Sequence, residues 1–249
     1  MKEAATGLVF EHSYNERLFS NKGLISKVHF SRYYWLRDKV RKYCPDANSV
    51  IELGCYDGKA LDFLPKKPST YCGYDANWED SLATAEKKWQ REKAFHFIFC
   101  DNPKQLNPNG DRFDISICME TLEHVPGMEQ GYIARLAAAT KKYAFITVPN
   151  EKGIILVLKH LSKKILNKPE SDHYTFKEFV NAFLGRMDKV KRSEICSHKG
   201  FDYDQLLKTL SLYFDIVEVK GMPLKFLPKS LNYTIGIVLK KKKANFLVK

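Results

Sequence analysis

The sequence predicts an α/β fold: one doubly wound sheet of seven strands, mostly parallel, with an antiparallel last strand and helices on both faces. From Val50 onward, apolar β-type runs alternate with helix-type stretches, which is typical of successive βαβ units. The 249 residues, 44% of them hydrophobic, suffice for one large core. No repeat or low-complexity linker divides the chain, so we expect residues 1–249 to form a single domain.

Seven apolar runs are expected to be strands, and the segments between them show helical patterns. The helical pattern is clearest at residues 79–91 and 128–142, and residues 11–43 predict one or two aromatic-rich helices. Residues 221–231 carry two prolines and cannot easily hold a crossover helix, so the last strand should return antiparallel. The expected strands are residues 50–53, 71–75, 95–100, 113–118, 143–148, 214–219 and 233–239.

Three segments lie outside this alternation. We expect residues 1–48 to form an N-terminal helical cap, residues 150–200 a substrate-side insertion or lid, and residues 240–249 a basic tail. The net charge is +12, and the stretch from Lys220 to the last residue holds eight lysines and no acid. A solvated chain end is the simpler interpretation of this stretch, but it could also contact phosphates or an anionic membrane.

Cysteine usage and hydropathy predict a reduced, cytoplasmic protein. The six cysteines form no CxxC pair, the first residues contain no apolar signal region, and the apolar run at residues 153–158 is too short to span a bilayer. The amphipathic stretch from Ile154 to Leu166 is expected to be a lid helix packed on the domain. The alternative is peripheral contact with the inner face of a membrane, together with the basic tail.

The first two strand ends carry residues suited to a nucleoside cofactor, because ligands of open α/β sheets bind at the carboxyl ends of the strands. The strand containing Glu52 runs into a tight turn with Gly54 and Gly58, where a backbone can approach a ligand closely. A purely structural turn would look the same. Asp75, followed by Ala76, is placed to accept the hydroxyls of a ribose, and its alternative role is a helix N-cap.

Two further strand ends add polar groups at the same edge. Asp101 and Asn102 could accept the exocyclic amine of an adenine, or could simply be turn residues before a proline. The next strand delivers Glu120, Glu123 and His124, which suit a general base or substrate orientation, unless they are solvated residues of a capped helix start. No metal site is expected, because this segment lacks the second histidine of a zinc-binding helix.

Together these segments resemble the class I (Rossmann-like) S-adenosylmethionine methyltransferases, in their small-molecule branch. Order and spacing agree from about Ser49 to Asn150, and the segment from His29 to Tyr33 resembles a His-x-x-Arg-Tyr segment that several relatives place over the cofactor. The resemblance implies S-adenosylmethionine as the cofactor and methyl transfer as the reaction. The residues it assigns to the cofactor are Glu52, Gly54, Cys55, Tyr56, Gly58, Asp75, Ala76, Asp101, Asn102 and Glu120.

One position departs from the family pattern. The glycine loop of the family has a middle glycine where this chain has Tyr56. The loop must therefore keep a negative φ at Tyr56, or the methionine tail of the cofactor must sit differently. A nicotinamide-dependent oxidoreductase is a less favoured alternative, because the chain has G-x-x-x-G and not the G-x-G-x-x-G fingerprint.

By the resemblance, an acceptor atom displaces the methyl group in line, and a hydroxyl acceptor needs a base near neutral pKa. His173 and His124 are preferred for that role over His198, although each alone could be structural. Tyr14, Arg17 and Arg32, together with the lysine-rich stretch at residues 152–168, are expected to form an aromatic and basic wall. Such a wall favours a polar, anionic acceptor such as a sugar, a nucleotide-sugar or a glycan intermediate, methylated at a hydroxyl. An RNA or other nucleic-acid methyltransferase or binder, or an inactive fold, stays open. The residues expected to contact the substrate are Tyr14, Arg17, His29, Arg32, Glu123 and His198.

Overall fold

The structure is a computed structural model that describes residues 23–165, 173–193 and 198–242. Two residues expected to contact the substrate, Tyr14 and Arg17, lie outside the described residues, as do Leu166 and the tail from residue 243 onward. Within the described ranges, none of the helices combines the length and hydropathy needed to cross a bilayer.

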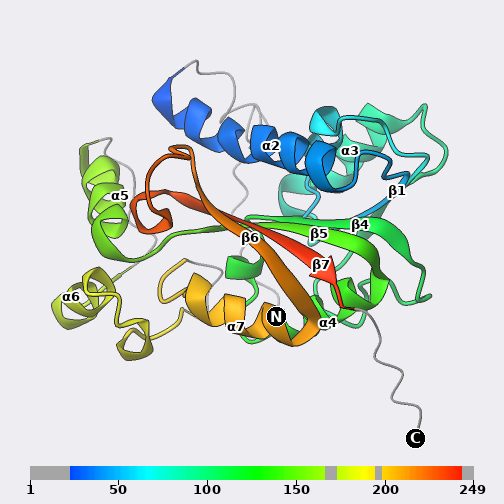
Figure 1. Ribbon diagram of the computed structural model, residues 1–249. Coiled ribbons are helices and arrows are strands. Elements are labelled where there is room, and N and C mark those ends of the chain that lie inside the picture. Colours follow the sequence, from blue (N-terminus) through cyan, green and yellow to red (C-terminus); the bar gives the residue numbers. More distant parts are fainter. Residues whose placement is uncertain (1–22, 166–172, 194–197, 243–249) are drawn as a thin grey trace, which may run out of the picture.

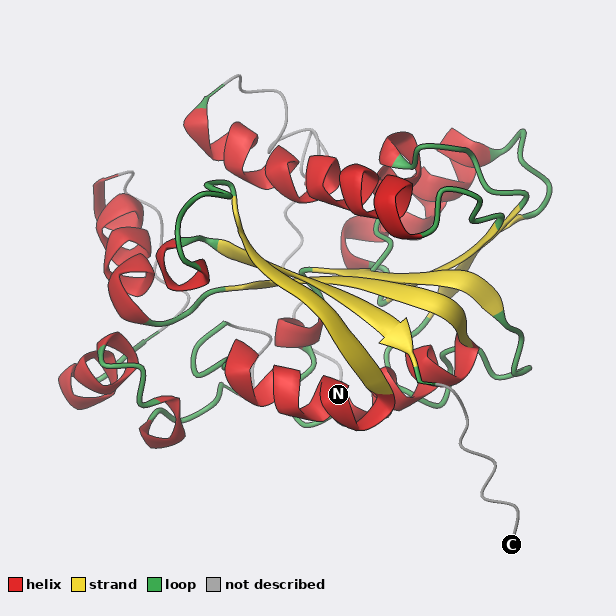
Figure 2. Cartoon of the chain, viewed as in Figure 1, coloured by secondary structure: helices red, strands yellow, loops and turns green. Residues whose placement is uncertain are grey.

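Seven strands form one sheet, which confirms the predicted fold class (Figures 1 and 2). The strands are β1 (Ser49–Leu53), β2 (Thr70–Asp75), β3 (Phe95–Phe99), β4 (Phe113–Met119), β5 (Thr140–Pro149), β6 (Phe214–Met222) and β7 (Thr234–Lys241). Their order is β3-β2-β1-β4-β5-β7-β6, with β7 antiparallel to both of its neighbours and β1 to β5 parallel. The order reverses between β1 and β4, where a doubly wound sheet opens its binding crevice.

Helices cover both faces of the sheet. The α-helices are α2 (Leu24–Tyr43), α3 (Ser81–Trp89), α4 (Glu129–Ala139), α5 (Gly153–Ile165), α6 (Phe176–Phe183) and α7 (Tyr203–Tyr213). In Figure 1, α2 and α3 lie on one face, α4 and α7 on the other, and α5 and α6 at one end of the sheet. The face under α2 is closely packed: Trp35 lies against Phe145, with ring centroids 6.5 Å apart, and directly over Gly236.

The predicted helix at residues 128–142 extends three residues too far at its C-terminal end, because β5 begins at Thr140. The Thr140 hydroxyl is fully buried and donates to the Leu136 carbonyl at 2.6 Å, and Thr140 pairs with Phe113 of β4. Strand pairing therefore overrides the local helical pattern at these residues. Similarly, the predicted helix from residue 79 begins at Ser81, since Glu79 and Asp80 have positive φ.

Candidate cofactor and acceptor site

The loop after β1 needs glycine at its first turn. Gly54 has φ +76°, and a Cβ there would lie 2.0 Å from the Thr121 hydroxyl, which follows β4. The Gly54 amide donates to the Tyr74 carbonyl at 2.7 Å, which ties the loop to β2. The ends of β1, β2 and β4 are thereby held against one another, and Gly58, also at positive φ, closes the same loop.

Tyr56 occupies the left-handed region, with φ +47°, so the expectation of a negative φ is wrong. Two hydrogen bonds hold it there: its amide donates to Asp75 Oδ2 at 2.9 Å, and its hydroxyl donates to Glu79 Oε2 at 3.0 Å. A non-glycine residue in this conformation costs about 1 to 3 kcal/mol, which these contacts offset. The other expectation, a shifted methionine tail of the cofactor, stays a prediction.

Asp75 lies at the tip of β2, where its side chain is 8% exposed. Its carboxylate accepts the backbone amides of Tyr56 and Asn77, both at 2.9 Å. Asn77 stands at the N-cap of the short helix η2 (Trp78–Asp80) and Asp80 at the N-cap of α3, so the helix-cap alternative for Asp75 is wrong. A carboxylate has about four acceptor positions, which leaves capacity for a ribose hydroxyl. Ala76, next in the chain, is exposed.

The end of β3 meets the end of β2, because the Cys100 amide donates to the Asp75 carbonyl at 2.8 Å. Asp101 is exposed and Asn102 is half-buried, and the Asn102 amide group donates to Asp101 Oδ1 at 2.9 Å. The sheet thus brings the expected ribose and adenine residues to one edge. Their individual contacts with a cofactor stay predictions.

Glu52 is buried beneath the glycine loop. The Tyr71 hydroxyl donates to Glu52 Oε2 at 2.6 Å, and burial raises the pKa of this carboxyl to about 8. Glu52 is therefore mostly protonated at neutral pH. Asp57, also buried, shares this loop and was missed by the sequence analysis, although its position between Tyr56 and Gly58 could have suggested it.

Two glutamates follow β4, and both have buried carboxylate oxygens that no hydrogen-bond donor reaches among the described residues. Glu120 has φ +52°, and its amide donates to the Thr147 carbonyl at 2.8 Å. Glu123 lies in the short helix η3 (Leu122–His124) and is fully buried. Within the described part of the chain, no donor reaches Oε1 of Glu120 or either carboxylate oxygen of Glu123. Burial, and then the charge of Glu120, raises the pKa of Glu123.

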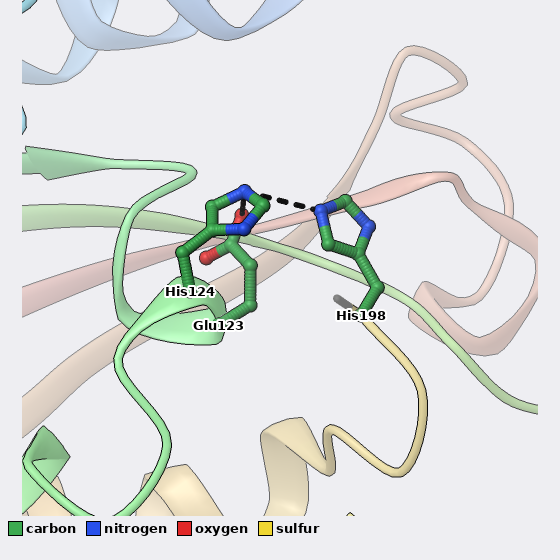
Figure 3. A group of neighbouring side chains, drawn as sticks. All are labelled: Glu123, His124 and His198. Carbon is green, nitrogen blue, oxygen red and sulfur yellow. Dashed lines mark hydrogen bonds and ion pairs between the residues drawn. The ribbon is translucent and has the colours of Figure 1, made fainter. Parts of the chain in front are cut away.

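Two histidines face each other beside Glu123 (Figure 3). His124 Nε2 and His198 Nε2 are 3.2 Å apart, so one nitrogen donates to the other and one proton lies between them. His198 Nδ1 contacts Glu151 Oε1 at 3.0 Å. Burial lowers the pKa of His198, but the hydrogen bond and charge of Glu151 more than offset this and raise it.

Glu151, which the sequence analysis missed, anchors this pair from the end of β5. Burial would raise its pKa, but Lys159, whose ammonium donates to Oε1 at 2.7 Å, and His198 lower the pKa to about 2. The signal that could have found it is its position directly after Pro149 and Asn150, at another strand end of the same sheet.

The group formed by Glu123, His124 and His198 can bind a cation. One ligand atom from each lies within 4.8 Å of the others, and His124 Nε2 is 3.9 Å from Glu123 Oε1. Ligand atoms on a cation with bonds of about 2.1 Å lie about 3.0 to 4.2 Å apart, so small shifts suffice. No metal site was expected, and that expectation rested on the spacing of residues within one segment. His198, in contrast, lies 74 residues after His124 in the sequence. His173 is exposed and is not part of this group.

Helix α2 contributes His29 and Arg32, two of the four described residues that were expected to contact the substrate. Arg32 is 7% exposed, and its charge opposes the rise in the pKa of Glu123. His29, one turn earlier, is half-buried. In contrast, lysines expected to line a basic lid are paired with acids: Lys152 donates to Asp204 at 2.7 Å, and Lys159 is bound to Glu151. These pairs leave less positive charge for an anionic acceptor than the sequence suggested.

Comparison with known proteins identifies the family. Residues 28–182 match the family model described as "Methyltransferase domain". The chain belongs to this family. A ubiquinone biosynthesis O-methyltransferase from Coxiella burnetii is 32% identical over 93 residues, 37% of this chain and 38% of the relative. A ubiquinone biosynthesis O-methyltransferase from Pseudomonas putida is 25% identical over 192 residues, which are 74% of this chain and 80% of the relative. The match to the Coxiella protein spans about two fifths of the length of that relative.

Solved structures share the fold at low sequence identity. Magnesium protoporphyrin IX methyltransferase from Synechocystis, crystallised with SAH, superposes with a TM-score of 0.59 at 17% identity, covering 91% of this chain and 92% of that one. An S-adenosylmethionine-dependent methyltransferase from Clostridium acetobutylicum gives 0.60 at 12% identity, covering 92% and 96%. The resemblance to class I methyltransferases is confirmed, and S-adenosylmethionine is the cofactor of this methyltransferase fold.

Proposed function

We propose that this methyltransferase moves the methyl group of S-adenosylmethionine to a hydroxyl oxygen of a small polar acceptor, and that Glu123, His124 and His198 activate that hydroxyl. The observation that carries the proposal is the fully buried Glu123 carboxylate, which has no hydrogen-bond donor among the described residues and faces two imidazoles. This group lies one short turn from Thr121, which packs on Gly54 of the cofactor loop. The curated relatives are also named O-methyltransferases.

A hydroxyl must lose its proton as its oxygen bonds to the methyl carbon and the carbon–sulfur bond breaks. A divalent cation held by the Glu123 carboxylate and the two imidazoles would lower the pKa of a coordinated hydroxyl. The three side chains present ligand atoms to one point, and burial raises the pKa of the Glu123 carboxyl. A cation there would compensate the charge of the ionised carboxylate, which favours this arrangement over His124 acting alone as the base.

Two classes of methyl acceptor are candidates, each suggested by a different observation. A sugar or glycan hydroxyl is expected from the sequence, while the names of the curated relatives suggest an intermediate of ubiquinone biosynthesis. The paired lysines of the lid weaken the argument for an anionic sugar. The nucleic-acid alternative depends on the basic tail, most of which lies outside the described residues, and no contact described above favours it.

The test combines chelation with matched variants. We expect protein treated with a chelator to bind S-adenosylhomocysteine normally, to lose turnover against the two classes of acceptor, and to regain it with Mn²⁺ or Zn²⁺. Glu123→Gln and His198→Gln should lose cation binding in calorimetry by at least about tenfold. His96→Gln is the control, because His96 is exposed on the distant edge strand β3.

Other outcomes separate the alternatives. Full turnover after chelation, together with an inactive His124→Gln variant, would show that His124 is the base without a cation. Full turnover in Glu123→Gln, His124→Gln and His198→Gln would overturn the proposed site altogether.

A further inference from the structure

Helix α5 carries apolar residues on two opposite faces. Ile155 and Leu156 face the core and are 3% and 2% exposed. Four other apolar residues recur at intervals of four, three and four, which is one stripe along a helix. Their side chains face solvent, with exposed fractions from 42% to 74%. These residues are Ile154, Leu158, Leu161 and Ile165.

Helix α6 repeats this arrangement beside α5. Phe176, Val180 and Phe183 follow the same helical spacing and are 86%, 38% and 45% exposed, while Ala182 on the other side is buried. The two helices pack together through Leu156 and Ala182, so both stripes lie on the outside. We call the seven exposed residues of the two stripes the outer apolar surface. Exposed apolar residues gathered on two helices that pack together are typical of an interaction site.

The charge around the outer apolar surface is positive. Helix α5 contains three lysines and no acidic residue. Lys159 is paired with Glu151, whereas Lys164 is exposed near the end of the helix. Lys177 is exposed on α6, whereas the acid of that helix, Glu178, accepts its own N-cap and the ammonium of Lys199. Apolar side chains beside lysines are the composition of helices that lie in the interface of an anionic bilayer.

We propose that the outer apolar surface docks this protein on an anionic membrane, with the apolar side chains entering the headgroup region and the lysines contacting lipid phosphates. A second copy of the chain fits less well, because a face-to-face pair would bring lysines against lysines. Docking would bring the site close to the bilayer, because α5 begins two residues after Glu151, the anchor of His198. Methylation of an acceptor held in the membrane rests on the proposed function, whereas membrane docking does not depend on it.

The basic tail does not belong to this surface. Strand β7 runs from Thr234, paired with Pro149 just before α5, to Lys241, paired with Phe214. The described start of the tail therefore lies at the opposite end of the sheet from α5 (Figure 1). The expected joint contact of the Ile154-to-Leu166 stretch and the tail with one flat membrane is thus not supported by the position of the tail.

The test is sedimentation of the full chain with vesicles, without cofactor or acceptor, so its failure leaves the proposed function untouched. We expect binding to phosphatidylglycerol-containing vesicles and much weaker binding to pure phosphatidylcholine. Leu161→Ser with Ile165→Ser should weaken binding about tenfold for each residue, and Lys164→Gln with Lys177→Gln about fivefold for each. The control is Leu212→Ser, because Leu212 is 64% exposed on α7, away from this surface.

Four results would overturn the proposal, and the second and third concern the variants. The first is wild-type protein that does not sediment with either vesicle. The second is an equal loss of binding in the Leu212→Ser control. The third is unchanged binding of the Leu161→Ser, Ile165→Ser variant at an unchanged melting temperature. The fourth is a wild-type dimer in light scattering that the Leu161→Ser, Ile165→Ser variant converts to a monomer, which would make the surface an interface between copies.

Discussion

Replacing Glu52 by glutamine should stabilise the protein, and increasingly so as the pH rises. Burial raises the pKa of this carboxyl from 4.5 to about 8, so folding must add a proton to it at neutral pH. A group with a raised folded pKa contributes its full stability below the unfolded pKa and loses it as the pH rises through the folded pKa. Between pH 4.5 and pH 7 the free energy of unfolding falls by about 3 kcal/mol for this reason, and the fall levels off above the folded pKa.

Glutamine keeps an oxygen that can accept the hydrogen bond of the Tyr71 hydroxyl, which is 2.6 Å long in the wild-type protein. Its side chain carries no charge at any pH. We expect Glu52→Gln to match wild type near pH 4.5 and to exceed it by about 3 kcal/mol at pH 7 in urea unfolding. The control is Glu218→Gln. Burial raises the pKa of Glu218, but Lys39 and Tyr43 lower it by more, so the folded state stabilises the ionised carboxylate. Glu218→Gln should therefore be less stable than wild type at neutral pH, and the difference should disappear as the pH falls.

A Glu52→Gln variant that is less stable than wild type at pH 7, or whose advantage does not change between about pH 5 and 8, would refute this reasoning. It would mean that Glu52 is ionised in the folded protein. A buried cation or an unrecognised donor would then have to compensate its charge.

The remaining predictions concern the cofactor edge and the core. Asp75→Asn should weaken S-adenosylhomocysteine binding about tenfold or more in calorimetry, because charged acceptors make the stronger hydrogen bonds, and the exposed Asp80→Asn should not. Unchanged affinity would exclude Asp75 from the ribose. Gly236→Ala places a methyl group 2.5 Å from the Trp35 ring, so it should destabilise the fold by about 1 to 3 kcal/mol in urea unfolding. Wild-type stability there would mean that Trp35 repacks freely.

The strands and the cofactor edge could be predicted because their signals are local. Period and turn residues mark the end of each strand, and parallel strands bring Asp75 and Asp101 to one edge regardless of packing detail. The antiparallel last strand followed from the prolines between β6 and β7. Boundaries such as Thr140 could not be predicted, since a buried hydroxyl and strand pairing decide them.

The site beyond the cofactor depends on contacts between distant parts of the chain. His198 meets Glu151 across 47 residues and His124 across 74, so no motif spacing could indicate either contact. The conformation of Tyr56 is also set from a distance, by Asp75 and Glu79. The amphipathic pattern of α5 was visible in the sequence, but only packing shows that its second apolar stripe faces outward.

The position of β7 makes the sheet depend on its last strand. Residues 234–241 bond to β5 on one side and to β6 on the other, so a fragment that stops before residue 234 leaves β5 and β6 each with an unpaired edge. During synthesis this strand must leave the ribosome before the sheet can close. Shortened versions of the protein are therefore expected to aggregate, whereas an extension beyond residue 242 leaves every strand pairing intact.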